Sequence, residues 1–543
     1  MGIGATAGVA AVGGVALGAQ ASDATPASSD SASGALAFDP DGYTELTTTI
    51  TDADGTDHDV TYRFWKAVTY VAKPVDATYQ SLNVSVPVEI DGTAVDASDA
   101  PILFANSVGG YMPSSVATAT GVGGGAPTGA PGGAGGTAGA SPAPSASASA
   151  SAGTGTGTGE VASGGNAMLN GQGKMVSLPK LALAAGYVVV EPGARGRTLK
   201  NAAGEYYGTA PAAIVDLKAA VRYVRANKGR IPGDTDRIVS SGTSAGGALS
   251  ALLGASGDSP LYDAALKEIG AADGSDAIFA TGTWCPITDL EHADGAYEWN
   301  WGTNATSGGG QVDQTVSKEL RARFAEYQAS LKLKGLGGFG TLTARNYDTY
   351  LLEQYLEPSA TTYLAALTDT ERETYLAKNT FITWNGKKAG FSWAGYLAHV
   401  GARKKSVPAF DGFDLSTGEN NLFGTGTTQA RHFTAYSLKH DTTGAGGSRV
   451  AADIPAKLRL MNPMHFLVED ANPRRAKHWW IRLGTNDSDT SHTVSANLAA
   501  AAAALGDDVS HLYYWDQGHG ANTDPGDFIA WIAEVTGYEK RVR

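Results

Sequence analysis

The chain has 543 residues, more than one ordinary domain holds, so we expect a core with large insertions or two to three domains. Hydrophobic residues make up 42% of the chain, enough for a well-buried core, and 71 glycines indicate long flexible stretches. The net charge of −14 argues against a nucleic-acid partner, because binding to phosphates needs clustered lysine and arginine. The single cysteine, Cys285, excludes an intrachain disulfide and a metal cluster held by several cysteines.

The N-terminal segment is apolar and rich in small residues. Met1–Ala21 ends in Ala19-Gln20-Ala21, which resembles a signal-peptide cleavage site, although the positively charged start of such a signal is missing. We expect residues 1–21 to be an export signal of the general secretory or twin-arginine type, and the protein to be secreted. The alternative is a disordered leader. A polar linker follows over 22–36, and the sequence predicts no integral membrane segment.

The next part of the chain has the pattern of antiparallel strands at one edge of a sheet. Leu46–Thr51, Val60–Trp65 and Leu82–Pro87 alternate β-branched and polar residues. Pro101–Ala105 is a short apolar run typical of a buried strand. Residues 114–165 are almost entirely Ala, Gly, Ser, Thr and Pro, so we expect a disordered insertion there.

Strands and helices then alternate, which indicates a mainly parallel sheet covered by helices. The predicted strands and helices, in chain order, lie at 187–190, 212–227, 237–241 and 276–284, and again at 478–483, 493–505, 509–515 and 527–535. Between these two groups, amphipathic helices around 320–331 and 351–356 indicate an inserted, mostly helical cap. We expect a core domain over 37–300 and 465–543, and a cap domain over 301–464.

The six residues from Gly242 to Gly247 carry the main chemical signal. Ser244 lies between a predicted strand and a predicted helix, with glycines on both sides. A nucleophile elbow needs this order, because the serine adopts a strained backbone and its neighbours must be small. The alternative is a glycine-rich turn. The strand–turn–helix context favours a catalytic Ser244 in an α/β-hydrolase fold.

In that fold the acid and the histidine follow the serine along the chain. His519 comes after the strand predicted at 509–515, on a loop that can reach the same sheet edge, and is the expected general base. His492 opens a helix and His511 lies within a strand, so both are weaker candidates. Asp487 comes soon after the preceding strand and is the expected acid.

An oxyanion hole needs two backbone amides directed at the reacting oxygen. Ala245 directly follows the nucleophile and supplies one of them. The loop Val108-Gly109-Gly110, after the first buried strand, is the expected source of the other. A Val-Gly-Gly sequence is also common in ordinary turns, so its position in the chain carries this interpretation.

These residues make the chain resemble the bacterial tannases, which are α/β-hydrolase esterases that cleave gallate esters. The resemblance covers nearly everything after Phe38 except the low-complexity insertion and parts of the cap. Within the matching stretches, Cys285–Ile287 and Leu290–Asp294 are far more specific than any esterase motif. The stretches are Asn106–Tyr111, Gly193–Thr198, Gly233–Gly254, Trp284–Trp299, Lys405–Phe410, Glu419–Gly424 and Asp487–Ser491, together with His519.

The resemblance implies a catalytic triad of Ser244, Asp487 and His519, with Gly110 and Ala245 at the oxyanion hole. It also implies that Lys405, Glu419 and Asp489 bind the galloyl ring. Charged groups that satisfy adjacent phenolic hydroxyls would discriminate against rings that lack them. Without the resemblance, these three residues would be interpreted as members of salt bridges.

The expected function is a serine esterase that releases gallic acid from galloyl esters through a galloyl-serine intermediate, with no metal and no cofactor. The alternatives are a feruloyl or general carboxylesterase, a serine peptidase of the same fold, or a secreted binding protein without activity. The expected partner is a small-molecule galloyl ester. The sequence leaves the oligomeric state and the preferred substrate size open. It favours Cys285 as a small buried hydrophobic residue rather than a reactive thiol.

Overall fold

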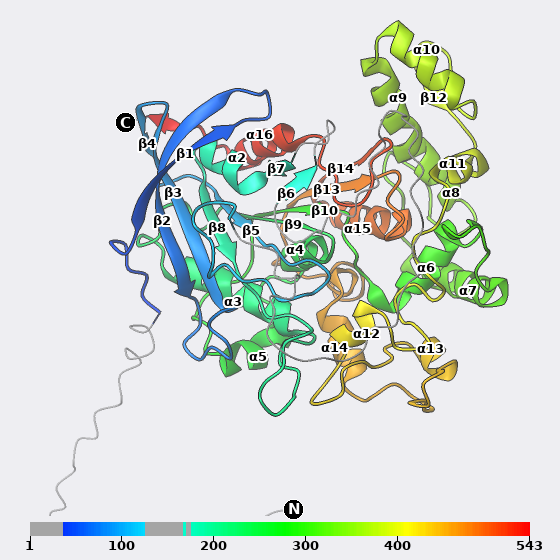
Figure 1. The fold of residues 1–543 in the computed structure, drawn as a ribbon, viewed down its shortest axis with the longest axis horizontal. Helices are drawn as coiled ribbons and strands as arrows, with labels where there is room; N and C mark the ends of the chain where they lie inside the picture. Colours follow the sequence, from blue (N-terminus) through cyan, green and yellow to red (C-terminus); the bar gives the residue numbers. More distant parts are fainter. Residues whose placement is uncertain (1–35, 125–166, 170–174, 543) are drawn as a thin grey trace, which may run out of the picture.

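A computed structural model describes residues 36–124, 167–169 and 175–542. The predicted export signal at 1–21 and the linker at 22–36, apart from Leu36, lie outside these residues. In Figure 1 the twisted sheet and the helices that flank it form the left and central part of the molecule. A mostly helical part lies at the right. No helix in the described ranges is long and apolar enough to cross a membrane.

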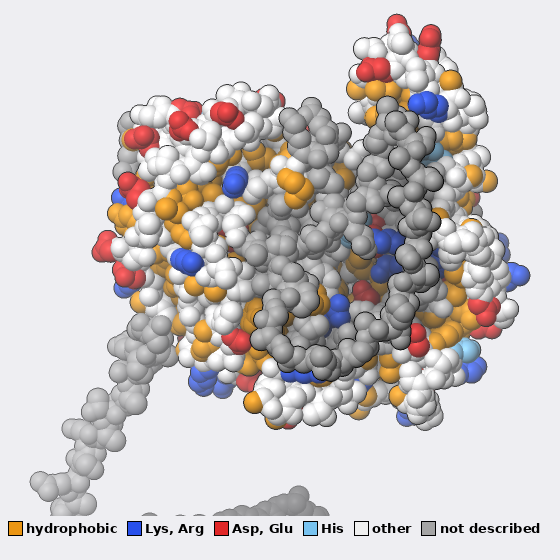
Figure 2. All heavy atoms as spheres, viewed as in Figure 1, with side chains coloured by type: hydrophobic (Ala, Val, Ile, Leu, Met, Phe, Trp, Pro, Cys, Tyr) orange, Lys and Arg blue, Asp and Glu red, His pale blue; other side chains and the backbone are white. Residues whose placement is uncertain are grey.

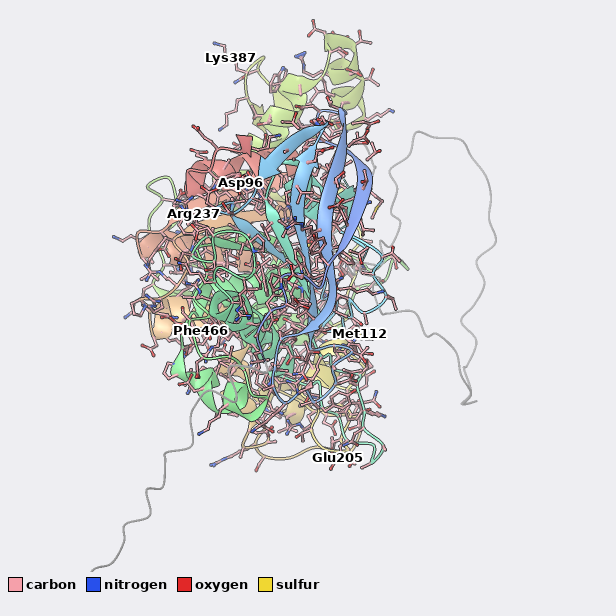
Figure 3. The ribbon with its side chains drawn as sticks, turned by 90° about the vertical axis from the view of Figure 1, so that its left-hand side faces the viewer. Asp96, Met112, Glu205, Arg237, Lys387 and Phe466 are labelled. Atoms are coloured by element: carbon pink, nitrogen blue, oxygen red, sulfur yellow. The ribbon has the colours of Figure 1, made fainter. Side chains whose placement is uncertain are left out.

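The first strands form an antiparallel edge, as the alternating sequence pattern predicts. β1 (Thr44–Thr51) pairs antiparallel with β2 (Asp57–Thr69), which pairs antiparallel with β3 (Ser81–Ile90). These three strands cover the side of the molecule that faces the viewer in Figure 3. β3 then pairs antiparallel with β8 (Val188–Pro192), where the parallel part of the sheet begins.

The centre of the sheet is parallel and its strands are buried, because helices cover them. In the described part of the chain the sheet has eleven strands, with the main order β1-β2-β3-β8-β5-β9-β10-β13-β14, and β4 and β15 at its margin. The remaining strands are β4 (Thr93–Asp96), β5 (Ile102–Ala105), β9 (Ile238–Thr243), β10 (Ala280–Trp284), β13 (His478–Gly484), β14 (Asp508–Tyr514) and β15 (Arg541–Val542). A separate hairpin pairs β6 (Ala167–Leu169) with β7 (Met175–Ser177). The predicted α/β-hydrolase architecture is confirmed.

Helices of small and aliphatic residues lie against this sheet. α2 packs with α16, while α4 contacts β9, β10 and α3, and α15 contacts β13 and β14. Gly254 of α4 lies so close to Thr281 of β10 that an added Cβ would be 2.8 Å from the Thr281 methyl group. The helices are α2 (Leu178–Ala184), α3 (Ala212–Ala226), α4 (Ala245–Ala255), α5 (Asp263–Glu268), α15 (His492–Ala504) and α16 (Pro525–Thr536), with a 3-10 turn at Pro260–Tyr262.

Helices also dominate the region predicted to be a cap. Trp299 connects this region to the core through ring contacts with Phe324, Tyr347 and Trp393. α9, α10 and the β11–β12 hairpin project from the body, and Lys387 marks their tip in Figure 3. The elements from β10 to β13 are α6 (Leu290–Trp301), α7 (Gln314–Leu331), α8 (Tyr347–Leu351), a π-helical turn (Leu352–Leu356), α9 (Glu357–Ala366), α10 (Asp369–Lys378), β11 (Thr383–Trp384), β12 (Ala389–Gly390), α11 (Trp393–Val400), α12 (Gly418–Leu422), α13 (Ala435–Lys439), α14 (Ile454–Leu460) and a second π-helical turn (His465–Glu469).

The start of the predicted disordered insertion is ordered, which corrects the prediction for residues 114–124. Ser114 forms a β-bridge with Ala194, and Val116 is buried. The Val122 amide donates to the Tyr62 hydroxyl at 3.2 Å. These few apolar side chains are enough to order the segment, because they pack onto a sheet that the rest of the chain forms. The remainder of the insertion, from 125 to 165, lies outside the described residues.

Candidate active site

Ser244 lies at a sharp turn between β9 and α4, with φ +60° and ψ −122°. The turn requires glycines, since a Cβ on Gly242 would be 2.2 Å from the carbonyl oxygen of Gly246, and one on Gly246 would be 2.6 Å from that of Val108. Such a strained backbone conformation is typical of a nucleophile elbow. The sequence therefore forces the side chain of Ser244 to the end of the sheet.

Ser244, His519 and Asp487 form a hydrogen-bonded line. His519 Nε2 is 2.8 Å from Ser244 Oγ, and His519 Nδ1 is 2.8 Å from Asp487 Oδ2. The three residues follow β9, β14 and β13, whose carboxyl ends meet at one edge of the parallel sheet. This arrangement can transfer a proton from the hydroxyl to the imidazole while the carboxylate fixes the tautomer. The geometry thus brings together the three residues expected from the sequence.

The electrostatics of the site favour a protonated imidazole. Burial alone lowers the pKa of His519, but the charges of Asp487 and Cys285 and the hydrogen bonds to both residues raise it, so the net pKa lies well above the ordinary value. The other candidate bases are placed elsewhere. His492 contacts Asn300 and Tyr396, and burial lowers its pKa to about 3. The ring nitrogens of His511 are buried, and this desolvation lowers its pKa well below the usual range.

The two amides expected to form the oxyanion hole lie at the start of α4 and in the loop after β5. Ala245 N is the first amide of α4, and Gly110 has φ +54° in the loop after β5. Asn106 fastens this loop to the elbow, since its Nδ2 donates to Ser241 O at 2.9 Å and to Gly246 O at 3.1 Å. Among the described residues, neither the Gly110 amide nor the Ala245 amide donates a hydrogen bond, so both remain available.

The three residues expected to bind the galloyl ring lie in two groups around the triad. Asp489 Oδ2 is 3.9 Å from His519 Nδ1 and 3.0 Å from Lys404 Nζ, so this residue does form a salt bridge. Burial raises the pKa of Asp489, but the charges of His519, Lys404 and Lys405 lower that pKa below its ordinary value. Lys405 Nζ also lies 4.3 Å from the centre of the Phe410 ring. Lys405 and Asp489 are therefore close to the triad acid.

Glu419 belongs to the second group, on α12. Burial and the charge of Glu419 both raise the pKa of Tyr111, the residue after Gly110. Burial lowers the pKa of Arg197, while the charge of Glu419 opposes this effect. Arg197 Nε donates to Gly110 O at 2.8 Å and its Nη1 donates to Asn421 Oδ1 at 2.9 Å. Arg197 thus connects the oxyanion loop to the helix that carries Glu419.

A buried ion pair holds the loop that carries Lys405. Arg403 and Glu298 of α6 are both buried, and Arg403 Nη1 donates to Glu298 Oε2 at 2.9 Å. Arg403 Nε donates to the carbonyl oxygen of Lys405 at 2.9 Å. The hydroxyl of Tyr297 accepts from Lys405 N at 3.0 Å and donates to Ser488 O at 2.8 Å. Tyr297 therefore holds both the loop of Lys405 and the loop that carries Asp487 and Asp489, called the acid loop below.

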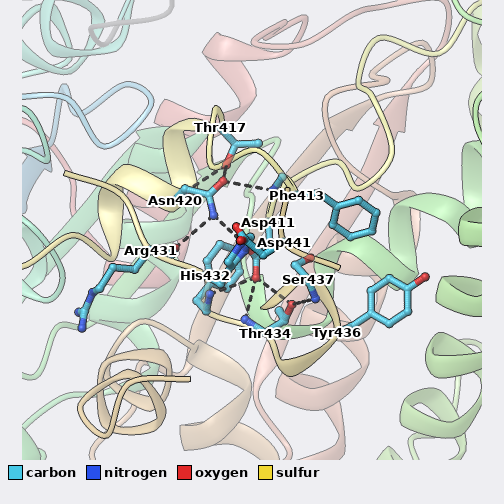
Figure 4. A network of polar contacts seen from close by, with 12 residues as sticks. Asp411, Phe413, Thr417, Asn420, Arg431, His432, Thr434, Tyr436, Ser437 and Asp441 are labelled. Atoms are coloured by element: carbon cyan, nitrogen blue, oxygen red, sulfur yellow. Dashed lines mark hydrogen bonds and ion pairs between the residues drawn. The ribbon is translucent and has the colours of Figure 1, made fainter. Parts of the chain in front are cut away.

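A second polar network holds α12 (Figure 4). Asp411 is buried and accepts from Asn420 Nδ2 at 2.7 Å and from Thr434 N at 2.7 Å. His432 lies between two carboxylates, with Nδ1 2.8 Å from Asp411 and Nε2 3.0 Å from Asp441. Burial lowers the pKa of His432, but both carboxylates raise it above its usual value. The network fixes the helix on which Glu419 lies.

Cys285 is the residue beside the triad that the sequence interpretation missed. It is buried, as expected, but its Sγ lies 3.9 Å from His519 Nε2. The sequence placed Cys285 directly after a predicted strand, but only the structure shows that this strand, β10, lies beside β9 and that Trp284 pairs with Thr243. Cys285 thus stands opposite Ser244 at the same sheet edge.

Charged side chains gather near the middle of the face in Figure 2, between the strands and the projecting helices. Lys and Arg lie there close to Asp and Glu, which suits a polar ligand better than an apolar one. A cavity of about 470 Å³ lies between α6, α7 and α14, and none of the three triad residues lines it.

Comparison with known proteins gives strong similarity to solved structures. A tannin acyl hydrolase in complex with 3,4-dihydroxybenzoate is 34% identical, with a TM-score of 0.73, and the match covers 92% of this chain and 98% of that one. A tannin acyl hydrolase in complex with ethyl gallate is 34% identical over the same shares, with a TM-score of 0.72. A tannase from Fusobacterium nucleatum is 35% identical, with a TM-score of 0.72, over 92% of this chain and 99% of that one.

Two shorter matches agree with an esterase. The BD-FAE family model matches residues 164–321, which include the elbow. Esterase LipC of Mycobacterium tuberculosis (strain ATCC 25618 / H37Rv) is 45% identical over 58 residues, which are 11% of this chain and 14% of that protein. The chain therefore spans only a small part of the curated relative that it matches.

Proposed function

Because this chain belongs to the tannase family, we propose that it is a serine esterase that hydrolyses galloyl esters and releases gallic acid. The observation that carries the proposed chemistry is the hydrogen-bonded line of Ser244, His519 and Asp487 in the nucleophile elbow. The similarity to tannin acyl hydrolases over nearly the whole chain supports the choice of ester.

In the proposed mechanism, His519 Nε2 takes the proton of Ser244 Oγ as that oxygen attacks the ester carbonyl carbon. The amides of Gly110 and Ala245 stabilise the tetrahedral oxyanion. The protonated imidazole then gives its proton to the leaving alcohol, and a galloyl-serine remains. Water, deprotonated by His519, hydrolyses this ester, so that gallic acid leaves and the hydroxyl of Ser244 is restored.

The charged groups around the triad explain a preference for a hydroxylated ring. A galloyl ring carries three adjacent hydroxyls, each of which donates and accepts hydrogen bonds. Asp489 and Glu419 accept from such hydroxyls, and the ammonium group of Lys405 donates to them. A ring without these hydroxyls would form none of these hydrogen bonds, which costs affinity in the transition state.

The test is a kinetic comparison of methyl gallate, methyl ferulate and a peptide amide with the purified full chain. We expect kcat/KM for methyl gallate to exceed that for methyl ferulate by at least about a hundredfold, given the number of hydrogen bonds lost. A higher value for methyl ferulate would instead indicate a feruloyl or general carboxylesterase. Cleavage of the amide would indicate a peptidase. A protein that neither hydrolyses any of these substrates nor reacts with a fluorophosphonate would be a binding protein.

A further inference from the structure

Cys285 lies beside the imidazole of His519, although the proposed hydrolysis gives its thiol no task. Its Sγ is 3.9 Å from His519 Nε2. The Cys285 sulfur, a His519 ring nitrogen and an Asp487 carboxylate oxygen all lie within 4.8 Å of one another. Thiolate, imidazole and carboxylate are the ligands that zinc prefers in proteins.

We propose that Cys285 and His519 form a binding site for a thiophilic divalent cation, for which Zn²⁺ is the probe, and that the bound ion inhibits the esterase. The inhibitory part rests on the proposed function, whereas metal binding at these two side chains does not. The observation that carries the proposal is that two strong metal ligands, Cys285 Sγ and His519 Nε2, lie 3.9 Å apart, and that Nε2 is also 2.8 Å from the reacting hydroxyl.

The spacing of the two donor atoms suits a bridging zinc ion. With a Zn–S bond of about 2.3 Å and a Zn–N bond of about 2.1 Å, tetrahedral geometry places the donor atoms roughly 3.6 Å apart. The observed separation is 3.9 Å, which a small rotation of either side chain closes. Ser244 Oγ, at 2.8 Å from Nε2, is the nearest oxygen for a third position, and water can complete the shell.

The backbone fixes the thiol in this place. Cys285 has φ +40° and its amide donates to Arg482 O of β13 at 2.7 Å. The preceding residue, Trp284, pairs with Thr243, directly before Ser244. Because strands on both sides hold this turn, the thiol is presented to the imidazole by the sheet rather than by a mobile loop.

The triad acid also prepares His519 for a metal. Asp487 Oδ2 accepts the Nδ1 proton at 2.8 Å, so the lone pair of the neutral ring is at Nε2. A metal-binding histidine usually has such a carboxylate on its other nitrogen, which orients the ring and raises its basicity. The same tautomer therefore serves the general base and the metal ligand.

A metal ion bound to His519 Nε2 would stop this nitrogen from acting as a base. When the ion binds, the Cys285 thiol releases its proton to solvent and a sulfur–metal bond forms, with no change of oxidation state. The Nε2 lone pair is then shared with the ion and cannot accept the Ser244 proton. Hard cations such as Mg²⁺ prefer oxygen ligands, so we expect them to have no such effect.

The binding test uses the full chain and competition between the protein and a chromogenic zinc chelator. We expect Cys285→Ala and His519→Ala each to weaken Zn²⁺ binding at least tenfold. His292→Ala is the matched control, because this histidine also pairs with an aspartate, Asp289 at 2.9 Å, but is not in the cluster, and its binding should equal wild type. Wild-type affinity in Cys285→Ala, or no binding by wild type, would overturn the proposal.

The second test measures inhibition of methyl gallate hydrolysis by Zn²⁺, with each variant compared to its own metal-free rate. We expect reversible inhibition of wild type, removed by EDTA, and at least tenfold weaker inhibition of Cys285→Ala and Cys285→Ser. Circular dichroism shows whether both variants fold. If wild type hydrolyses methyl gallate but inhibition is independent of Cys285, this inference alone fails. If wild type does not hydrolyse methyl gallate, the proposed function fails and the binding test still decides.

Discussion

At the scale of single residues, His519 is the centre of the site, because its two nitrogens face different partners. Nδ1 is 2.8 Å from a carboxylate, while Nε2 is 2.8 Å from the serine hydroxyl. Burial is the largest single effect and opposes the charged imidazole, but Asp487 and Cys285 together outweigh it, so the pKa of His519 is raised. The group that must act as a base therefore binds its own proton more tightly than an ordinary histidine.

This pKa predicts the acidic limb of the pH–rate profile. Catalysis needs the neutral imidazole, so activity is lost as the pH falls below the pKa of His519. Because that pKa is raised, we expect kcat/KM for methyl gallate to rise with pH through a midpoint above 6.5. Asp487→Asn should move the midpoint down and reduce kcat by about 10⁴-fold, the loss typical of a triad acid. A wild-type midpoint at or below 6.5 would contradict this electrostatic description.

Arg197 is a positioning residue for the oxyanion loop. Its Nε donates to Gly110 O at 2.8 Å and its Nη1 to Asn421 Oδ1 at 2.9 Å. A hydrogen bond from a charged donor contributes about 1.5–3 kcal/mol, so we expect Arg197→Ala to reduce kcat for methyl gallate about tenfold or more. Asn421→Ala is the control, since it removes the contact to α12 and keeps the one to Gly110. An equal loss of kcat in both variants would argue against a role at Gly110.

The residues that could be predicted from sequence are those with a local signature. Ser244 is specified by its glycines, which the close approach of Gly242 to Gly246 requires. His519 and Asp487 follow from their positions after late strands. Cys285 and Arg197 have no local signature, because their roles depend on strand register and on a loop that meets α12. Lys405, Glu419 and Asp489 could be named only through the family resemblance, since charged residues in loops are usually solvated or paired.

At the scale of elements, α6 and the loop after α11 act together. Glu298 of α6 pairs with Arg403, both side chains have no exposed surface, and Arg403 holds the carbonyl oxygen of Lys405. Desolvation makes such a pair costly to form, but removal of one partner leaves a buried charge without compensation. The pair is therefore a support for the Lys405 loop more than a source of net stability.

We expect Glu298→Ala to lower the free energy of unfolding by about 3–5 kcal/mol, because the guanidinium of Arg403 remains buried. The KM for methyl gallate should rise in the same variant, since the Lys405 loop loses its support. Urea denaturation and steady-state kinetics measure the two effects. Lys388→Ala serves as the control, because Lys388 is 59% exposed in its pair with Glu357 and such pairs contribute under about 1 kcal/mol. Equal stabilities of the two variants would contradict the account of the buried pair.

Element boundaries show where sequence patterns lose information. The helix expected at 212–227 is observed as Ala212–Ala226, because its apolar residues recur at helical spacing and are buried. Residues 114–124 have the composition of a disordered segment, yet Val116, Ala119 and Val122 are buried against the sheet. Amino-acid composition is an average over many residues. It therefore cannot show that three apolar side chains of a segment fit against the sheet.

At the scale of the whole molecule, the projecting helices contact the loop that carries His519. Asp516 accepts a hydrogen bond from Tyr375 of α10 and lies 2.6 Å from His399 Nε2 of α11. Its own amide donates to Thr485 Oγ1 at 2.8 Å, next to the acid loop. One aspartate, three residues before the proposed catalytic base, therefore joins the helical part of the molecule to the core.

We expect Asp516→Ala to loosen this junction. Amide hydrogen exchange in α10 and α11 should accelerate, and kcat/KM for methyl gallate should fall, because the His519 loop loses two side-chain contacts. Asp369→Ala is the matched control, since Asp369 is 95% exposed and pairs with Arg372 within α10. Unchanged exchange in α10 and α11 of Asp516→Ala would show that the helices dock independently of this residue.

The alternation of strands and helices predicted a mainly parallel sheet with an inserted helical cap, and the elbow at Ser244, with the family resemblance, identified it as an α/β-hydrolase. These signals could not predict how the helices at 314–460 meet the core, because contacts such as those of Asp516 and Arg403 join residues more than a hundred positions apart. The proposed galloyl site depends on these contacts, so its geometry becomes visible only in the folded molecule.

Covalent labelling and turnover of Ser244→Ala test the central claim most directly. The account predicts that a fluorophosphonate adds one adduct to wild type at Ser244, seen by mass spectrometry of the digested protein. It also predicts that Ser244→Ala takes up no label and loses methyl gallate turnover by at least about 10³-fold, as expected for removal of a nucleophile. A Ser244→Ala protein that folds and keeps near wild-type turnover, or a label on another residue, would contradict it.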